Sequence, residues 1–100
     1  MNYAGKDNGT AVLRLSGRFD FSAFRPFREL YEPLLSDSDV SVIELNFAAV
    51  EYVDSAALGM LLMLRDKGEK LGKKVVLSGC GGNVQQLLEV ANFQQLFEIA

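Results

Sequence analysis

Residues 52–62 constrain the fold of this 100-residue chain more than any other stretch. They join a run rich in β-branched residues, 40–47, to an apolar segment that ends at Leu64, where charged residues begin. This change of pattern predicts a buried strand that turns directly into a helix. Asp54 or Ser55 stands where that helix would begin, and either side chain can accept a hydrogen bond from a free N–H group of the first helical turn.

The start of this helix also suits a negative charge, because free N–H groups and the helix dipole both favour an anion. A phosphate on Ser55 would therefore be tolerated, and it would act as a switch if another protein reads this surface. The simpler interpretation is that Asp54 and Ser55 only cap the helix, and the two roles are compatible. Asp54 could also orient the serine hydroxyl for a kinase.

The rest of the chain alternates strands with helices. A tight hairpin is expected at residues 7–9, because Asn8 and Gly9 accept positive φ. Gly17 is expected to end the second strand, Pro33 to kink or shorten the first helix, and Asn83 with Gln86 to form a capping box for the last. Strands are expected at 2–6, 10–16, 40–47, 74–78 and 96–99, and helices at 22–35, 55–71 and from Asn83 to about Asn92.

The resulting order, β-β-α-β-α-β-α-β, predicts a single α/β domain with a mixed sheet over residues 1–100, covered by helices on one face or on both. Successive strand–helix–strand units make parallel strands, so three strand-to-helix loops, 17–22, 51–55 and 79–83, should share the carboxyl edge of the sheet. Asp20 is therefore expected close to Asp54 and Ser55. A metal site or a catalytic triad is not expected, because the chain has no histidine and one cysteine.

Composition excludes several classes of function. A hydrophobic fraction of 49% and a charged fraction of 23% are typical of a globular protein. The net charge of −3 argues against nucleic-acid binding. The longest apolar run, 56–64, is too short to cross a membrane, and no secretory signal is visible, so a cytoplasmic protein without membrane insertion is expected.

The helix that follows Asp54 has an uneven distribution of apolar residues. At 100° per residue, one side should face the core; its residues are Ala57, Met60, Leu61, Leu64 and Leu71. Leu58, Leu62 and Met63 fall among charged residues instead. They form either an exposed patch for a partner, which we expect, or part of a wide buried face.

The segment Asp54-Ser55-Ala56-Ala57-Leu58-Gly59, between an apolar strand and an apolar helix, resembles the signature of STAS domains. The resemblance covers nearly the whole chain and includes Asp20, which follows the strand that is expected to end in Gly17. Many members carry serine or glycine at the positions of Ala56 and Ala57, which we take as small equivalents. The branch most similar to this chain is that of the anti-sigma factor antagonists.

This resemblance implies a function without catalysis or a cofactor of its own. The unphosphorylated domain would bind a serine-kinase anti-sigma factor, phosphorylation of Ser55 by that kinase would release it, and a phosphatase would reset the switch. ATP and Mg²⁺ would belong to the kinase. The expected partner-binding residues are Asp20, Asp54, Ala56, Ala57, Leu58, Gly59, Leu62 and Met63.

Two other functions stay open. The same surface could dock permanently, as in a STAS subunit of a lipid-transport complex or a signalling scaffold. An enzyme or small-ligand binder could use the loop edge, although the glycine-rich loop 79–82 lacks the complete pattern of a dinucleotide or phosphate loop and is more simply a tight turn.

Overall fold

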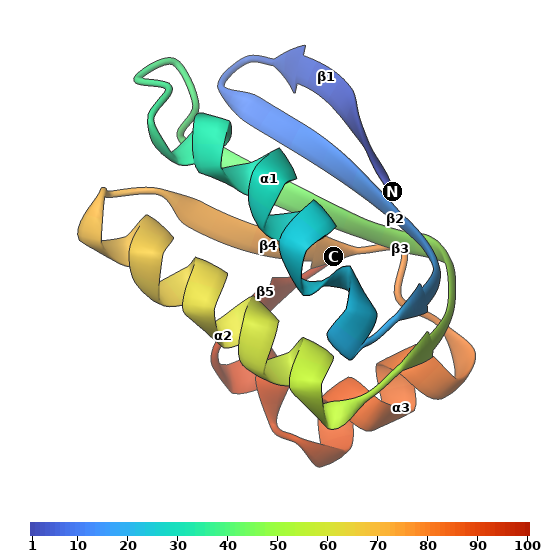
Figure 1. Ribbon diagram of the computed structural model, residues 1–100. Coiled ribbons are helices and arrows are strands. Elements are labelled where there is room, and N and C mark those ends of the chain that lie inside the picture. The colour runs from blue at the N-terminus through green and yellow to red at the C-terminus, as the bar shows by residue number, and fades with distance from the viewer.

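The computed structural model describes residues 1–100 as one α/β domain built on a five-stranded sheet (Figure 1). The strands lie in chain order; β1 and β2 are antiparallel, and all later neighbours are parallel. The predicted mixed sheet and the order β-β-α-β-α-β-α-β are confirmed. The elements are β1 (Asn2–Asp7), β2 (Thr10–Phe19), the 3₁₀ turn η1 (Phe21–Ala23), α1 (Phe24–Leu35), β3 (Val42–Val53), α2 (Ser55–Lys70), β4 (Lys74–Ser78), α3 (Gly82–Val90), the 3₁₀ turn η2 (Phe93–Gln95) and β5 (Glu98–Ile99).

The helices cover one face of the sheet only. Figure 1 shows α1 and α2 side by side over the strands, and α3 closes the lower end of the same layer with the buried residues Val84 and Leu88. In β3 the side chains of Ile43, Leu45 and Phe47 are buried, while those between them are only half-buried. This alternation is that of a sheet with one face against a core. Of the two arrangements predicted, the single layer is correct.

Aromatic rings fill the core between α1 and the sheet. Phe19 meets Phe27 edge to face, with ring centroids 5.1 Å apart, and Phe47 at 6.0 Å. Phe27 then meets Tyr31 at 5.1 Å. Edge-to-face pairs add attraction to the burial of the rings, so this cluster fixes α1 against the C-terminal halves of β2 and β3.

No helix combines the length and apolarity that crossing a membrane requires.

Two predicted chain reversals are confirmed by their backbone geometry. Asn8 and Gly9 have φ of 51° and 82°, as a tight hairpin turn between β1 and β2 requires. Gly72, with φ of 71°, follows the end of α2. There Gly72 N–H donates to the Glu69 carbonyl at 3.1 Å and Lys73 N–H to the Gly68 carbonyl at 2.8 Å, which satisfies two carbonyls that the helix end leaves free.

The prediction that Gly17 ends the second strand is wrong. Gly17 adopts a φ of 64° inside β2, where the pairing with β3 shifts register, and the strand continues to Phe19. β3 likewise runs on to Val53 rather than stopping at residue 47. The reason is that a positive φ at glycine permits a bulge, after which Phe19 can return to the core and pair with Val53.

The predicted helix ends also need correction. Gly81, in an extended conformation, precedes α3 without any side-chain cap, so the expected capping box of Asn83 and Gln86 does not form. Leu71 is 57% exposed rather than core, because α2 has ended at Lys70 and the chain is already turning toward β4. Pro33 does not stop α1, which continues to Leu35.

Candidate functional site

The register of the two longest parallel strands sets the geometry at the start of α2. Phe19, the last residue of β2, pairs with Val53, the last residue of β3. Asp20 and Asp54 therefore leave the sheet at the same edge, each directly before a helical turn. This edge is the predicted one, and the structure brings the Asp20 loop next to the start of α2.

Asp54 connects the two helical turns at this edge. Its Oδ1 accepts a hydrogen bond of 2.8 Å from the Ala57 N–H and caps α2, while its Oδ2 accepts one of 3.2 Å from the Phe21 N–H of η1. Both carboxylate oxygens are thus occupied by backbone donors. No hydrogen bond joins the Asp54 carboxylate to the Ser55 hydroxyl, so the structure shows Asp54 as a cap, and its orienting of the hydroxyl for a kinase stays a prediction.

Asp20 performs the same capping task for η1. Its Oδ1 accepts hydrogen bonds from the Ser22 N–H at 3.0 Å and from the Ser22 hydroxyl at 2.6 Å, and its Oδ2 accepts one from Arg18 Nε at 3.3 Å. The hydroxyl bond first, and then the other donors, hold the pKa of the Asp20 carboxyl below its usual value. The Arg18 guanidinium also lies 4.2 Å from the ring centre of Tyr52, so a polar cluster borders the site.

Ser55 is the first residue of α2 and its side chain is exposed. Because Asp54 is the capping residue, the Ser55 hydroxyl is left without an intramolecular hydrogen bond. Ser22 at the same edge is also exposed, but its hydroxyl is bound to Asp20. Of these two serines, Ser55 is the one whose oxygen is free to react or to bind.

The third loop predicted at this edge begins further back than the other two. β4 ends at Ser78, which pairs with Asn46, so β4 stops well before the end of β3 at Val53. Gly79 approaches the backbone of Ala48 instead. The end of this loop nevertheless reaches the edge, because Asn83, with Val84 and Leu87 of α3, lines a hollow with Glu51, Tyr52 and Val53. The three loops therefore share the carboxyl edge as predicted, but the third begins further back because β4 is the shorter strand.

The predicted partner-binding residues of α2 fall on three different sides of the helix. Ala57 is fully buried, which excludes it from a partner interface. Leu58 and Leu62 are half-buried and pack against the core, on the flank of α2 that also carries Arg65. Arg65 Nε donates to the carbonyl of Leu96 at 2.7 Å, so this flank faces the C-terminal segment. The prediction of one exposed patch of Leu58, Leu62 and Met63 is wrong.

The exposed apolar surface lies on the opposite flank of α2. Met63 is 42% exposed, and with Ala56, Gly59 and Met60 it lines a groove of about 510 Å³ whose other wall is Phe21 and Phe24. Phe21 is 77% exposed, an unusual state for so large an apolar side chain. We call these six residues the apolar groove. It begins one residue from Ser55.

Sequence reasoning missed Phe21 and Phe24 as site residues. Phe21 lies in the loop expected at 17–22 and Phe24 in the helix expected at 22–35, and nothing in their local pattern marks them as exposed. One signal in the sequence could have identified them. Phe27, Tyr31 and Leu34, at helical spacing, already form a complete buried face of α1, so the two earlier phenylalanines are not needed for the core. Phe21 precedes that face and sits in a 3₁₀ turn, where its side chain is directed away from the core.

Known proteins with a similar sequence identify the family of this chain. The family model described as "Mlab, STAS domain" matches residues 3–98. The STAS-domain containing protein PA14_20770 of Pseudomonas aeruginosa (strain UCBPP-PA14) is 38% identical over 94 residues, which cover 94% of this chain and 91% of that protein.

Several solved structures share the fold. The unphosphorylated anti-sigma factor antagonist SpoIIAA superposes with a TM-score of 0.77 at 20% identity, over 99% of this chain and 86% of that one. The phosphorylated form of SpoIIAA, from Bacillus, gives 0.75 at 19% identity, over 99% and 89%. The STAS domain of the SulP transporter from Vibrio cholerae gives 0.74 at 23% identity, over 96% and 76%. The match along nearly the whole chain establishes that this protein belongs to the STAS-domain family.

Proposed function

We propose that this protein is an anti-sigma factor antagonist of a partner-switching pathway, and that Ser55 is its phosphorylation site. The observation that carries the proposal is the position of Ser55: an exposed hydroxyl without an intramolecular partner, on the first residue of α2 and beside the apolar groove. The unphosphorylated chain would bind a serine-kinase anti-sigma factor. Phosphorylation by that kinase would dissociate the complex, and a phosphatase would reset it.

The start of α2 can accommodate a phosphate without unfolding. The group adds about −1.5 to −2 charges at neutral pH. Free N–H groups of the first turn and the helix dipole partly compensate that charge. Asp20 and Asp54 each bind donors of their own, so a phosphate on Ser55 would raise the local negative potential without displacing a buried group.

The apolar groove supplies the contact that the phosphate would control. An exposed phenylalanine, Phe21, and an exposed methionine, Met63, offer a partner apolar area that water covers poorly. A doubly charged phosphate next to this area must lose hydration when the partner binds, which is costly unless the partner provides donors. One modification could thus switch the interface while the fold is unchanged.

Two features of related proteins support this proposal. SpoIIAA, whose structure has this fold, is described as an anti-sigma factor antagonist and exists in phosphorylated and unphosphorylated forms.

The chain would act by binding alone, and ATP and Mg²⁺ would be bound by the kinase. The proposed compartment is the cytoplasm, where such a kinase and sigma factor act.

The decisive experiment is to measure the intact mass of the protein isolated from its own cells. Native protein should carry a fraction with one phosphate, and Ser55→Ala should carry none. Ser22→Ala is the matched control, because Ser22 is an exposed serine at the same edge and its loss should leave the phosphorylated fraction unchanged. Phosphate that persists in Ser55→Ala, or maps to another serine, would refute the assignment.

A second candidate function is a permanent STAS subunit of a lipid-transport complex or a signalling scaffold. The likeness to the STAS domain of a SulP transporter favours it, since there the same fold is part of a larger protein. This alternative predicts stable co-purification with one complex and no phosphate on Ser55 in any growth condition. The intact-mass measurement therefore separates the two functions.

A further inference from the structure

The apolar groove leads into a group of cationic side chains toward the C-terminal ends of α1 and α2. Arg28 lies one helical turn beyond Phe24 on α1, on the same side of that helix. Lys67 lies one turn beyond Met63 on α2, and Lys70 follows on the same flank. We call Arg28, Lys67 and Lys70 the basic end. The groove and the basic end form one strip along the two helices, which lie side by side (Figure 1).

Lys67 reaches across from α2 to α1. Its Nζ lies 5.6 Å from the ring centre of Tyr31, a buried residue of α1. Arg28 forms an ion pair with Glu32 in the next turn of α1. The hydrogen bond from Arg28 first, and the charges of Arg28 and Lys67 as well, hold the pKa of the Glu32 carboxyl below its usual value. The basic end therefore spans both helices, as the apolar groove does.

Lys67 and Lys70 form no ion pair within this chain. The two acids in the same part of α2, Asp66 and Glu69, lie instead against the Arg65 guanidinium, at 3.6 and 3.5 Å. In a chain of net charge −3, this end of the helical layer thus keeps two cations that a partner can pair. The surface that complements them carries carboxylates.

The shape of the strip fits a helix. Both walls are helical, and α2 presents the small residues Ala56 and Gly59, which let a second helix axis approach to about 8–10 Å. A Cβ at Gly59 would have no atom within 4 Å, so the space above it is open. From Ser55 to Lys67 the strip is roughly 18 Å long, the length of about 12 helical residues.

We propose that this strip binds an amphipathic helix of the partner, antiparallel to α2. The inference rests on the proposed function, since the occupant is a helix of the protein whose binding Ser55 controls. Apolar side chains at three- and four-residue spacing fill the apolar groove, and carboxylates meet the basic end. Carboxylates are favoured in the first turn of a helix, so the partner helix begins at the basic end and ends beside Ser55.

This direction explains how a phosphate would act on the contact. The last turn of a helix carries free carbonyl groups and a partial negative charge. A phosphate on Ser55 would face that end and repel it. Asp20 and Asp54 impose less repulsion in its absence, because donors of this chain bind both carboxylates.

The test measures binding of the full chain to a synthetic peptide, the probe for the partner helix, by fluorescence anisotropy. The peptide has about 14 residues, with glutamates in its first turn, leucines at three- and four-residue spacing, alanines elsewhere and blocked ends. Wild type should bind it. Lys67→Glu and Lys70→Glu should each weaken binding about tenfold, because like charges then meet, and Ser55→Glu should weaken it about fivefold.

Two further peptides test the charge and the direction of the partner helix. With lysines in place of the glutamates, Lys67→Glu should bind more tightly than wild type does. With the glutamates moved to the last turn, wild type should bind about fivefold more weakly, since the carboxylates then lie away from the basic end.

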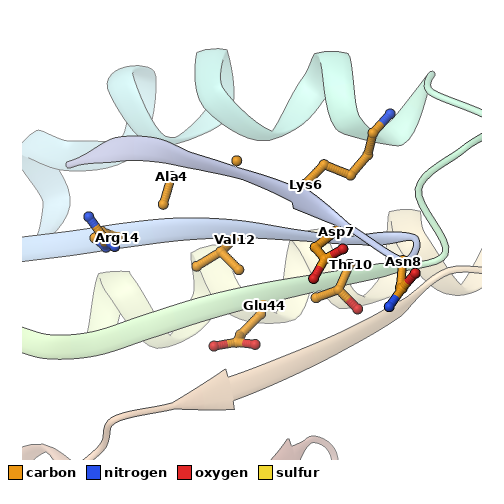
Figure 2. A pocket seen from close by; sticks show the side chains of 9 residues that line it. Ala4, Lys6, Asp7, Asn8, Thr10, Val12, Arg14 and Glu44 are labelled. Carbon is orange, nitrogen blue, oxygen red and sulfur yellow. The ribbon is translucent and has the colours of Figure 1, made fainter.

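Arg14→Glu is the control. Arg14 is an exposed arginine on the face of the sheet that no helix covers, where it borders a hollow of about 620 Å³ together with Glu44 (Figure 2). Its reversal should leave the affinity for each peptide unchanged. Thermal melts of every variant verify that the fold persists.

No saturable binding of the first peptide up to about 1 mM would overturn the inference. So would affinities that Lys67→Glu and Lys70→Glu leave unchanged, or equal affinities for the two placements of the glutamates. Binding of phosphatidylglycerol vesicles in place of the peptide would assign the strip to a membrane and overturn it as well. The proposed function fails separately, because an intact mass without phosphate would refute it even where the peptide binds.

Discussion

At the scale of single residues, Asp54 shows how one side chain can join two parts of a site. Its carboxylate caps α2 through the Ala57 N–H and holds η1 through the Phe21 N–H. The second bond matters for the surface, because η1 carries Phe21, one wall of the apolar groove. Asp54 is thus a residue of the fold that positions the contact surface, in addition to standing next to Ser55.

Replacing Asp54 should therefore cost more than the loss of an ordinary surface acid. We expect Asp54→Ala to lower the free energy of unfolding by about 1–3 kcal/mol, since a helix cap and a second charge-assisted bond are both lost. Urea denaturation measures this. Asp66→Ala is the control: its carboxylate makes only an exposed ion pair with Arg65, so its effect should stay within about 0.5 kcal/mol. Equal effects of the two variants would contradict the bridging role.

The pKa of Asp20 offers a second test at this scale. The carboxyl titrates below its usual value of 3.8, first because of the Ser22 hydroxyl. A depressed pKa means that the ionised form stabilises the fold, so this contribution is complete at neutral pH and is lost as pH falls through the lowered pKa. We expect Ser22→Ala to raise the Asp20 pKa toward 3.8 in a carboxyl-carbon NMR titration. No movement would mean that the hydroxyl bond is not formed in solution.

At the scale of elements, α2 divides its surface into a core face and two unlike flanks. Leu61 and Leu64 are fully buried, Leu58 and Leu62 are half-buried toward the C-terminal segment, and Met63 is exposed in the apolar groove. The helix thus attaches to the domain through two of its sides. Only the third side, with Ala56, Gly59 and Met63, is free to meet a partner.

Truncation along α2 should follow this division. Leu61→Ala should lower stability by about 2–5 kcal/mol, because transfer and cavity terms combine at a site without exposure. Leu58→Ala should cost less than Leu61→Ala and more than Met63→Ala, which should stay within about 0.5 kcal/mol. Thermal melts give the ranking. A Met63→Ala variant as unstable as Leu58→Ala would show that Met63 is packed, and the groove would then not be an open surface.

A glycine within α2 and the glycine just after it should respond oppositely to alanine. Gly59 lies within the helix with no atom near the added Cβ, so Gly59→Ala should stabilise the protein by about 1 kcal/mol. Gly72 has a φ of 71°, where a Cβ is strained, so Gly72→Ala should destabilise it by about 1–2 kcal/mol. Urea midpoints measure both. Shifts of the same sign would contradict the assigned helix end.

At the scale of the whole molecule, a single helical layer leaves the domain with two separate surfaces. The helical side carries Ser55 and the apolar groove, and the uncovered sheet carries Arg14 and Glu44. A core lies between them, with Leu13, Leu45 and Leu77 at zero exposure on the three central strands. No side chain belongs to both surfaces, so a change on one surface has no direct contact through which to alter the other.

This separation predicts that variants on the two surfaces act independently. Arg14→Glu should leave the phosphorylated fraction of the protein from cells unchanged, and its effect on stability should be independent of that of Ser55→Glu. The effects of the two changes on the free energy of unfolding, measured in dilute solution, should add within about 0.5 kcal/mol. A larger deviation would reveal coupling through the core.

Local patterns in the sequence were sufficient for much of this architecture. The order of strands and helices, the hairpin at Asn8 and Gly9, the chain reversal at Gly72 after α2 and the core residues Leu61 and Leu64 all follow from periodicity and from the φ preferences of single residues. Each of these features depends on residues within a few positions of one another. The proximity of Asp20 to Asp54 also followed, because parallel pairing brings the ends of β2 and β3 together.

Tertiary structure alone decided what those patterns left open. Gly17 marks a bulge and not an end because β3 continues beside it, and the third loop stands back because β4 is short. A helical wheel assigns directions but not neighbours: it could not show that the C-terminal segment approaches one flank of α2, near Leu58, while Phe21 approaches the other. The exposure of each α2 side chain at the site depends on segments that are distant in the sequence, and the local pattern around Ser55 does not predict where those segments lie.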